Sequence, residues 1–167
     1  MANESPNEVL QRYLEDTIAA EKSFESQLRT MADEGHYAPA KELFARHADE
    51  TRTQHERLTA RLEQLGGSPS ALKTAAAHVF NSTPKAAQLG HSSAEKSTQN
   101  LIIAFTVENS EVATYEALAT VAAAAGDQAT ERLAREIQEE ERRASPHIWQ
   151  MIAPSSREAF QLLAHAA

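Results

Sequence analysis

A regular spacing of apolar residues is clearest in residues 10–31, which read LQRYLEDTIAAEKSFESQLRTM. Steps of three and four residues pick out one stripe, formed by Leu10, Leu14, Thr17, Glu21, Phe24, Leu28 and Met31. This spacing is typical of a helix that packs against other helices in a bundle. Glu21 stands in the middle of the stripe, where a leucine would be expected.

Three further stretches repeat this pattern, and each places at least one glutamate among apolar residues. Their stripes are Leu43, His47, Glu50, Gln54, Leu58 and Leu65; Leu101, Ala104, Glu108, Glu111, Tyr115 and Leu118; and Leu133, Ile137, Glu140, Ala144, His147 and Met151. A single shift along the sequence lays Glu21 on Glu111 and also Glu50 on Glu140. We therefore predict a bundle with internal pseudo-twofold symmetry, in which four carboxylates meet at one level.

Glycines mark the ends of the expected helices. Gly35, the Gly66–Gly67 pair and Gly126 follow long runs rich in Ala, Leu, Glu, Gln and Arg, which favour helix, and glycine is common just beyond a helix C-terminus. Alternating apolar and polar residues, the pattern of a strand, are not sustained in any segment. The predicted helices lie at about residues 6–34, 38–65, 93–125 and 127–152.

The links between these helices indicate the topology. Short links after the first and third helices predict two antiparallel hairpins, because a few residues can only reverse the chain. The long segment 66–92, which we expect to contain a short helix near 70–80, can cross from one end of the bundle to the other. Two hairpins joined by such a crossover form the ferritin-like arrangement, although four-helix bundles without a crossover remain an alternative.

The C-terminal region contains a proline and a capping pattern. Pro146 should kink or restart the fourth helix, because proline lacks the N–H that helix interiors use. Ser155 with Glu158 resembles a capping box that opens a short last helix at about 155–165. The expected fold is an all-α, ferritin-like four-helix bundle: a single domain over residues 1–167 whose bundle occupies about residues 6–152.

Composition excludes several classes of protein. The 167 residues are 41% hydrophobic and 24% charged and include no cysteine, which argues against disorder, a disulfide scaffold and thiolate metal sites. The net charge of −8 argues against a nucleic-acid partner. The first residues, MANESPNEVLQRYLED, lack the basic and apolar regions of a signal peptide, and no apolar run approaches the ~20 residues of a membrane span. We therefore expect a cytoplasmic protein that does not bind membranes.

Convergent carboxylates in a helical core require compensation, because each unpaired buried charge costs several kcal/mol. They retain protons, pair with basic side chains or bind divalent cations. Carboxylates with one or two imidazoles suit iron or manganese, and a bundle core can hold two such ions through bridging glutamates. A single glutamate on a stripe is usually solvated, but four, one in each helix, favour the metal site.

Four stretches resemble the YciF-like branch of the ferritin-like superfamily, a group of bacterial stress-associated proteins. They are AAEKSFESQL (19–28), HADETRTQHERL (47–58), TVENSEVATYEAL (106–118) and EIQEEERR (136–143). The resemblance implies a di-metal carboxylate site and a homodimer. It would make Glu21 and Glu111 ligands of two divalent ions, with Glu50 and Glu140 as bridges and Glu108 as an additional ligand. Iron is expected in preference to manganese.

The sequence departs from the usual di-iron pattern, in which Glu-x-x-His occurs on two helices. Thr53 and Arg143 occupy the expected histidine positions, and Arg143 could instead pair with a carboxylate. His47 precedes Glu50 by one turn and could either bind metal or hold Glu50 in place.

The leading hypothesis is a di-metal protein that protects against oxidative or general stress, with ferroxidase- or peroxidase-type chemistry on dioxygen or peroxide as an open question. The alternative is a metal-free helical module that serves in dimerisation or as a scaffold. A third hypothesis, binding of a lipid or hydrophobic ligand, rests only on the alanine run at 122–125.

Overall fold

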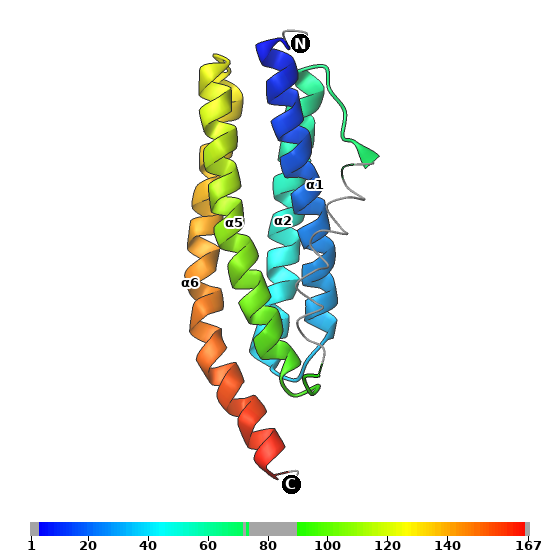
Figure 1. Ribbon diagram of the computed structural model, residues 1–167, viewed down its shortest axis with the longest axis vertical. Coiled ribbons are helices and arrows are strands. Elements are labelled where there is room, and N and C mark those ends of the chain that lie inside the picture. Colours follow the sequence, from blue (N-terminus) through cyan, green and yellow to red (C-terminus); the bar gives the residue numbers. More distant parts are fainter. Residues whose placement is uncertain (1–3, 72, 74–89, 166–167) are drawn as a thin grey trace.

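The computed structural model describes residues 4–71, 73 and 90–165, which form a bundle of four long helices (Figure 1). Helices α1 (Pro6–Asp33) and α2 (Ala38–Gln64) form one antiparallel hairpin, and α5 (Lys96–Ala124) and α6 (Gln128–His165) form the other. The all-α four-helix bundle predicted from the sequence is therefore confirmed. The short helix expected near 70–80 falls largely outside the described residues.

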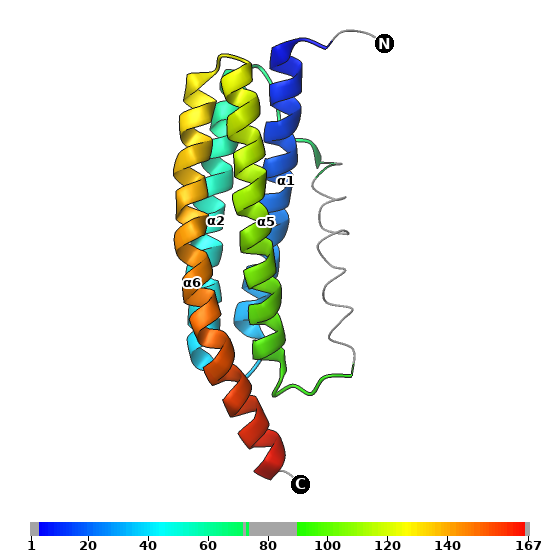
Figure 2. The same ribbon diagram turned by 60° about the vertical axis from the view of Figure 1, so that its left-hand side comes forward.

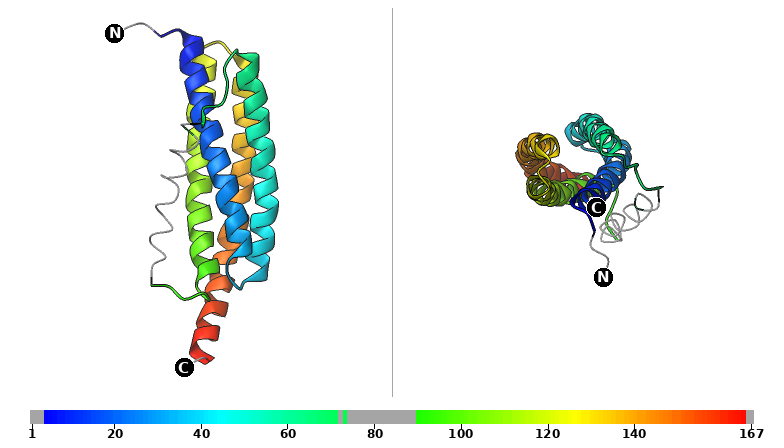
Figure 3. Two further views of the ribbon diagram at one scale, coloured as in Figure 1. Left: turned by 90° about the vertical axis from the view of Figure 1, so that its right-hand side faces the viewer. Right: turned by 90° about the horizontal axis from the view of Figure 1, so that it is seen from above.

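The two hairpins lie side by side, so that every helix runs antiparallel to its neighbours. Seen from above, the order around the bundle is α2, α1, α5 and α6 (Figure 3). Because α2 ends at the end of the bundle opposite to the start of α5, the chain must traverse the bundle between the hairpins (Figure 2). Contacts are extensive within each hairpin and sparse between α2 and α6, which leaves that side of the bundle the least closed.

Local interactions explain where the helices begin and end. The Ser5 hydroxyl accepts a hydrogen bond from the Glu8 N–H while the Glu8 carboxylate accepts one from the Ser5 N–H, so a capping box starts α1. After α1, Gly35 adopts a φ of 81°, and a Cβ placed there would lie 2.2 Å from Ser97 Oγ. A glycine is thus required both by the backbone conformation and by the close approach of α5.

Helix α6 is continuous, so it does not restart at Pro146, and the expected separate helix at about 155–165 is wrong. It passes through Pro146 and Pro154 to His165 and bends along its C-terminal half (Figure 1). Ser155 does not open a separate helix; its side chain is buried and forms a 2.8 Å hydrogen bond with Thr98 on α5. Tertiary packing against α5 thus outweighs the helix-breaking tendency of the prolines.

The apolar core is divided into two clusters at different levels of the bundle. The first contains Leu10, Leu14, Ile18, Leu58, Leu62, Tyr115, Leu118, Ala119, Ala122, Ala134 and Ile137. The second contains Phe24, Leu28, Met31, Ala40, Phe44, Ala48, Leu101, Ile103, Ala104 and Ile148. In every helix, a short stretch of buried polar residues separates the two. None of the helices in the described part of the chain is long and apolar enough to span a membrane.

Candidate metal centre

A layer of buried polar side chains lies between the two apolar clusters. Four of its members are the glutamates Glu21, Glu108, Glu111 and Glu141, contributed by α1, α5 and α6, and α2 contributes His47, Thr51 and Gln54. Glu108 is 0% and Glu141 1% exposed, so these carboxyl groups have lost almost all contact with water. We call these seven residues the acid layer.

One group within the acid layer has the composition of a metal site. His47, Glu108 and Glu141 each offer a ligand atom, and these three atoms lie within 4.8 Å of one another. His47 Nε2 forms a hydrogen bond with Glu108 Oε1 and lies 4.0 Å from Glu141 Oε2. The group therefore joins α2, α5 and α6 around a common centre.

The other two buried glutamates lie beside this group. The Tyr115 hydroxyl donates a hydrogen bond to Glu21 Oε1, which ties the Glu21 side chain on α1 to the neighbouring helix α5. Glu111 follows Glu108 by three residues, so both carboxyl groups extend from the same face of α5. The electrostatic effect of Glu21 and Glu141 on Glu111 indicates that the four acids act on one another.

The acid layer passes a simple test of fit to a divalent cation. Each of the four glutamates has one fully buried oxygen without a hydrogen-bond partner: Glu21 Oε2, Glu108 Oε2, Glu111 Oε1 and Glu141 Oε2. Buried polar atoms are normally satisfied, because an unpaired one costs roughly 1–3 kcal/mol. Carboxylate oxygens together with one imidazole are donors that iron and manganese accept. The residues present therefore fit such an ion.

Burial changes the protonation of these groups. Burial raises the pKa of Glu21 to about 8, although its hydrogen bond from Tyr115 acts in the opposite direction. Burial, reinforced by the charge of Glu108, raises the pKa of Glu141 to about 10, and burial likewise raises the pKa of Glu111. Without a cation, the acid layer thus holds protons at neutral pH.

The pKa of His47 is shifted in the direction that favours the charged form of the side chain. Burial alone would lower the pKa of His47, but its hydrogen bonds to Glu108 and Glu50 outweigh burial and raise the pKa to about 10. An imidazolium therefore occupies the position beside Glu108 when no metal is bound. A metal ion that binds His47 must displace this proton.

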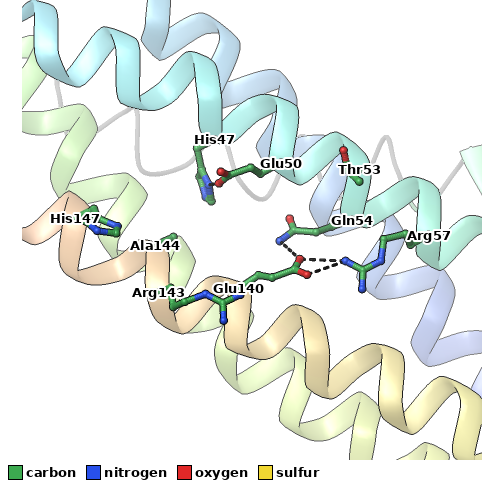
Figure 4. A pocket seen from close by; sticks show the side chains of 9 residues that line it. All are labelled: His47, Glu50, Thr53, Gln54, Arg57, Glu140, Arg143, Ala144 and His147. Atoms are coloured by element: carbon green, nitrogen blue, oxygen red, sulfur yellow. Dashed lines mark hydrogen bonds and ion pairs between the residues drawn. The ribbon is translucent and has the colours of Figure 1, made fainter.

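Glu50 and Glu140 do not occupy the buried positions that the sequence analysis assigned to them. The Glu50 side chain is 67% exposed and that of Glu140 is 35% exposed. Both line a cavity of about 480 Å³ between α2 and α6, where Glu140 forms an ion pair with Arg57 and accepts a hydrogen bond from Gln54 (Figure 4). The buried positions belong to the next residues in the chain, Thr51 and Glu141.

The structure therefore brings together four of the six predicted metal ligands, Glu21, His47, Glu108 and Glu111, and places Glu50 and Glu140 at the rim. Glu141 and Gln54 complete the arrangement: the Gln54 amide donates a hydrogen bond to Glu141 Oε1. Gln54 was on the predicted stripe but had no assigned role, and Glu141 was missed. A sequence signal for Glu141 exists in the seven-residue spacing of Ala134, Glu141, Ile148 and Ser155.

The fold and the acid layer define a class: four-helix-bundle proteins with a carboxylate-rich core. Within that class, the family described as "Domain of unknown function (DUF892)" matches residues 5–160, and the chain belongs to this family. The YciF-like resemblance inferred from the sequence is thus confirmed for family and fold. No curated protein matches the chain.

Solved structures support the same assignment of fold. The stress protein YciF of E. coli is 22% identical, with a TM-score of 0.80 over 93% of this chain and 99% of that one. A protein of Xanthomonas campestris is also 22% identical, with a TM-score of 0.78 over 95% of this chain and 98% of that one. YcfI of Rhodopseudomonas palustris is again 22% identical, with a TM-score of 0.74 over 87% of this chain and 93% of that one. At these identities the similarity shows the fold alone.

Proposed function

We propose that the acid layer binds divalent iron or manganese and that the protein uses the bound metal in protection against oxidative or general stress. The observation that carries this proposal is the set of four buried carboxylate oxygens without partners. Divalent cations bound to these carboxylates would replace the protons that the acid layer otherwise retains, and would give the unpartnered oxygens a partner. The description of E. coli YciF as a stress protein is consistent with this role.

Some residues of the site would bind the metal as ligands, and others would position those ligands. His47, Glu108 and Glu141 would bind one ion, and Glu21 and Glu111 would bind a second or complete the first. Tyr115 holds Glu21, and Gln54 holds Glu141, through the hydrogen bonds described above. The apolar clusters on both sides limit the access of water to the acid layer.

Bound iron would supply a redox couple for reaction with dioxygen or peroxide, as in ferroxidase- or peroxidase-type chemistry. This chain contributes proton-holding groups for such a reaction in Glu21, Glu141 and His47, whose pKa values all lie above their ordinary range because of burial or hydrogen bonding. Manganese would provide a structural or redox-protective alternative at the same donors.

Metal analysis tests the proposal directly. The protein is dialysed against anaerobic Fe²⁺ or against Mn²⁺, and bound metal is measured per chain together with the melting temperature. We expect about one to two ions per chain and a higher melting temperature that chelator reverses. The double variant Glu108→Gln/Glu141→Gln should lose both effects, whereas Glu63→Gln, at an exposed position on α2, should keep them.

Failure of the wild-type protein to bind either metal would overturn the proposal and would favour the alternative of a metal-free helical module. In that case the acid layer would be satisfied by retained protons together with the hydrogen bonds from Tyr115, Gln54 and His47. The melting temperature of the protein would then not respond to metal or to chelator.

A further inference from the structure

Two cavities between α2 and α6 form one groove on the outside of the acid layer. The cavity of about 480 Å³ described above and a second one of about 320 Å³ share His47, Glu50, Ala144 and His147. We call the two cavities together the α2–α6 groove. Its walls are two stripes with steps of three and four residues: Arg46, Glu50, Thr53 and Arg57 on α2, and Glu140, Arg143 and His147 on α6. Because the helices are antiparallel, the end of one stripe faces the start of the other.

Charges are balanced at the end of the groove nearer the start of α6. There Arg57 forms ion pairs with Glu140 at 2.9 Å and with Glu136 at 3.0 Å. Glu140 also accepts a hydrogen bond from Gln54 at 3.2 Å. The guanidinium group of Arg57 is thus occupied by acids of this chain and is not left for a ligand.

The other end of the groove carries an excess of positive charge. Arg46, Arg143 and His147 line it, and none of these side chains has an acidic partner within ion-pair distance in the described part of the chain. Glu50 is the acid at this end, and its hydrogen bond with His47, together with the charges of Arg46 and His147, lowers its pKa against the effect of burial. Two guanidinium groups therefore lie beside one carboxylate that His47 already binds.

These cationic groups approach the groove from both walls. Arg46 belongs to α2, whereas Arg143 and His147 are one turn apart on the same face of α6 (Figure 4). Positive charge in a concave site concentrates the electric field and attracts anions, although the protein as a whole has a net charge of −8. The local excess of positive charge thus runs against the overall charge of the molecule.

The donors in the groove suit a phosphate group better than a carboxylate. A guanidinium group binds an oxyanion through paired N–H groups, and each pair requires two oxygens. A carboxylate has two oxygens and can satisfy one such pair, whereas a phosphate group has at least three and carries nearly two charges. It can therefore accept hydrogen bonds from Arg46 on one wall and from Arg143 on the other.

The groove also has the size of a small-molecule site. Its two cavities, of about 480 and about 320 Å³, fall within the range of roughly 300–1,000 Å³ that is usual for ligand pockets. Contacts between α2 and α6 are sparse. A ligand that joins these helices would add contacts where the bundle has few, so its binding should stabilise the folded protein.

We propose that the α2–α6 groove binds a phosphate group, free or carried by a small organic molecule, between Arg46 of α2 and Arg143 and His147 of α6. The proposal concerns a second site, outside the acid layer. It holds whether or not the acid layer binds metal.

Isothermal titration calorimetry with metal-free, full-length protein tests the site. Inorganic phosphate, glycerol 3-phosphate and acetate are titrated at constant ionic strength in buffer without chelator, because chelators are themselves anions. We expect both phosphates to bind more tightly than acetate, and phosphate to raise the melting temperature when sodium chloride of equal ionic strength does not. Tighter binding of glycerol 3-phosphate would assign the site to an organic phosphate, and equal binding would assign it to free phosphate.

Two variants with matched controls locate the site. Arg46→Gln/Arg143→Gln should weaken phosphate binding by about tenfold or more, because both charged donor groups are gone. Arg52→Gln/Arg157→Gln removes the same charge from exposed positions of α2 and α6 outside the groove and should bind as the wild type does. Arg46 and Arg143 are exposed, so their replacement leaves the core intact.

A negative charge introduced into the groove provides a second test. Ala144 lines both cavities, so Ala144→Glu should repel phosphate and weaken its binding, whereas Ala153→Glu, at an exposed position further along α6, should not. A wild-type protein that does not bind phosphate, or that binds it no better than acetate, would refute the proposal. Phosphate binding that either groove variant leaves at wild-type strength would refute it as well. Because no metal is present in these titrations, such a failure would leave the proposed function of the acid layer standing.

Discussion

Glu141 occupies a position on α6 where an apolar residue would stabilise the bundle more. Ala134 and Ile148, seven residues before and after it, are buried on the same stripe, and Glu141 is as buried as they are. Its carboxyl group receives a hydrogen bond from Gln54 on one oxygen, while the other oxygen receives none and, when protonated, can only share its proton with Glu108. A residue whose burial is only half compensated in this way is typical of a binding site rather than of a core.

The raised pKa values predict how the stability of the metal-free protein depends on pH. Burial raises the pKa of Glu21 and of Glu141, to about 8 and about 10, and hydrogen bonds to Glu108 and Glu50 raise that of His47 against the effect of burial, to about 10. The folded state therefore binds more protons than the unfolded chain, so the free energy of unfolding falls as pH rises from about 4.5 to about 10. In chelator, we expect the melting temperature to fall by about 5 °C or more between about pH 5.5 and about pH 8.5.

Glu141→Gln provides the control for this pH dependence, because glutamine cannot lose a proton. The variant should show a smaller decline of the melting temperature over the same range. Added Mn²⁺ should stabilise the wild-type protein more at the upper pH, since it displaces protons on binding. A melting temperature that is constant or rises with pH in chelator would contradict the assigned protonation of the acid layer.

The hydroxyl of Tyr115 has a single structural task, the hydrogen bond to Glu21. Tyr115→Phe would leave both Glu21 oxygens without a partner, and we expect it to lower the free energy of unfolding by about 1–2 kcal/mol. Urea denaturation in chelator measures the change. Tyr13→Phe, at a more exposed site on α1, should cost little, and an equal loss in the two variants would count against a role for the Tyr115 hydroxyl.

At the scale of the helix, the sequence was sufficient to predict which face is buried in α1 and α5, but not in α2 and α6. Every residue of the stripes predicted for α1 and α5 is buried, because their steps of three and four residues leave little choice of face. In α2 and α6 the buried stripe passes through Thr51 and Glu141 instead of Glu50 and Glu140. The chain offers three successive glutamates at 139–141, so a step of three or four after Ile137 fits equally well.

The choice between these two faces depends on contacts between helices, which the spacing of one helix does not contain. The internal repeat reinforced the wrong choice, since it aligned Glu50 with Glu140 and both are rim residues. Apart from the C-terminal end of α6, which lies at His165 instead of about 152, helix ends were predictable to within a few residues because capping groups and glycines specify them locally. The continuity of α6 through Pro146 and Pro154 could not be predicted from local sequence, because packing of Ile148 and Ser155 against the bundle maintains the helix beyond each proline.

The prolines of α6 lead to a prediction at this scale. Pro146 is exposed and lies inside the helix, where it provides no N–H for the carbonyl of Arg142. Pro146→Ala should restore that hydrogen bond and raise the free energy of unfolding by about 1–2 kcal/mol, after allowance for the greater freedom of the unfolded chain. Urea denaturation of the metal-free protein measures it. A decrease in stability would mean that the bend of α6 is needed for packing.

The whole molecule has an end that the bundle does not cover. The C-terminal part of α6 extends beyond the other helices (Figure 2) and exposes Phe160, Leu162 and Leu163, and Trp149 is exposed nearer the bundle. Large exposed apolar side chains of this kind mark surfaces that associate. They provide a physical reason to expect the homodimer that the family resemblance implies.

This expectation can be tested by light scattering coupled to size-exclusion chromatography. We expect the wild-type protein to elute as a dimer and Phe160→Ser to shift the population toward the monomer, because Phe160 is the most exposed of these side chains. Arg157→Ser, an exposed polar position on the same segment, should remain dimeric. A wild-type monomer, or a Phe160→Ser variant as dimeric as the wild type, would exclude this end of α6 as the interface.

The acid layer also gives the molecule its organisation: two apolar clusters hold four helices together, and the polar layer between them requires a cation or protons. Crystals grown with Mn²⁺ and measured at the manganese absorption edge locate the cation directly. We predict an anomalous peak among His47, Glu108 and Glu141, with any second peak toward Glu21 and Glu111. Anomalous peaks confined to the rim at Glu50 and Glu140 would contradict a buried metal centre. The absence of any peak from crystals grown in saturating Mn²⁺ would contradict it as well.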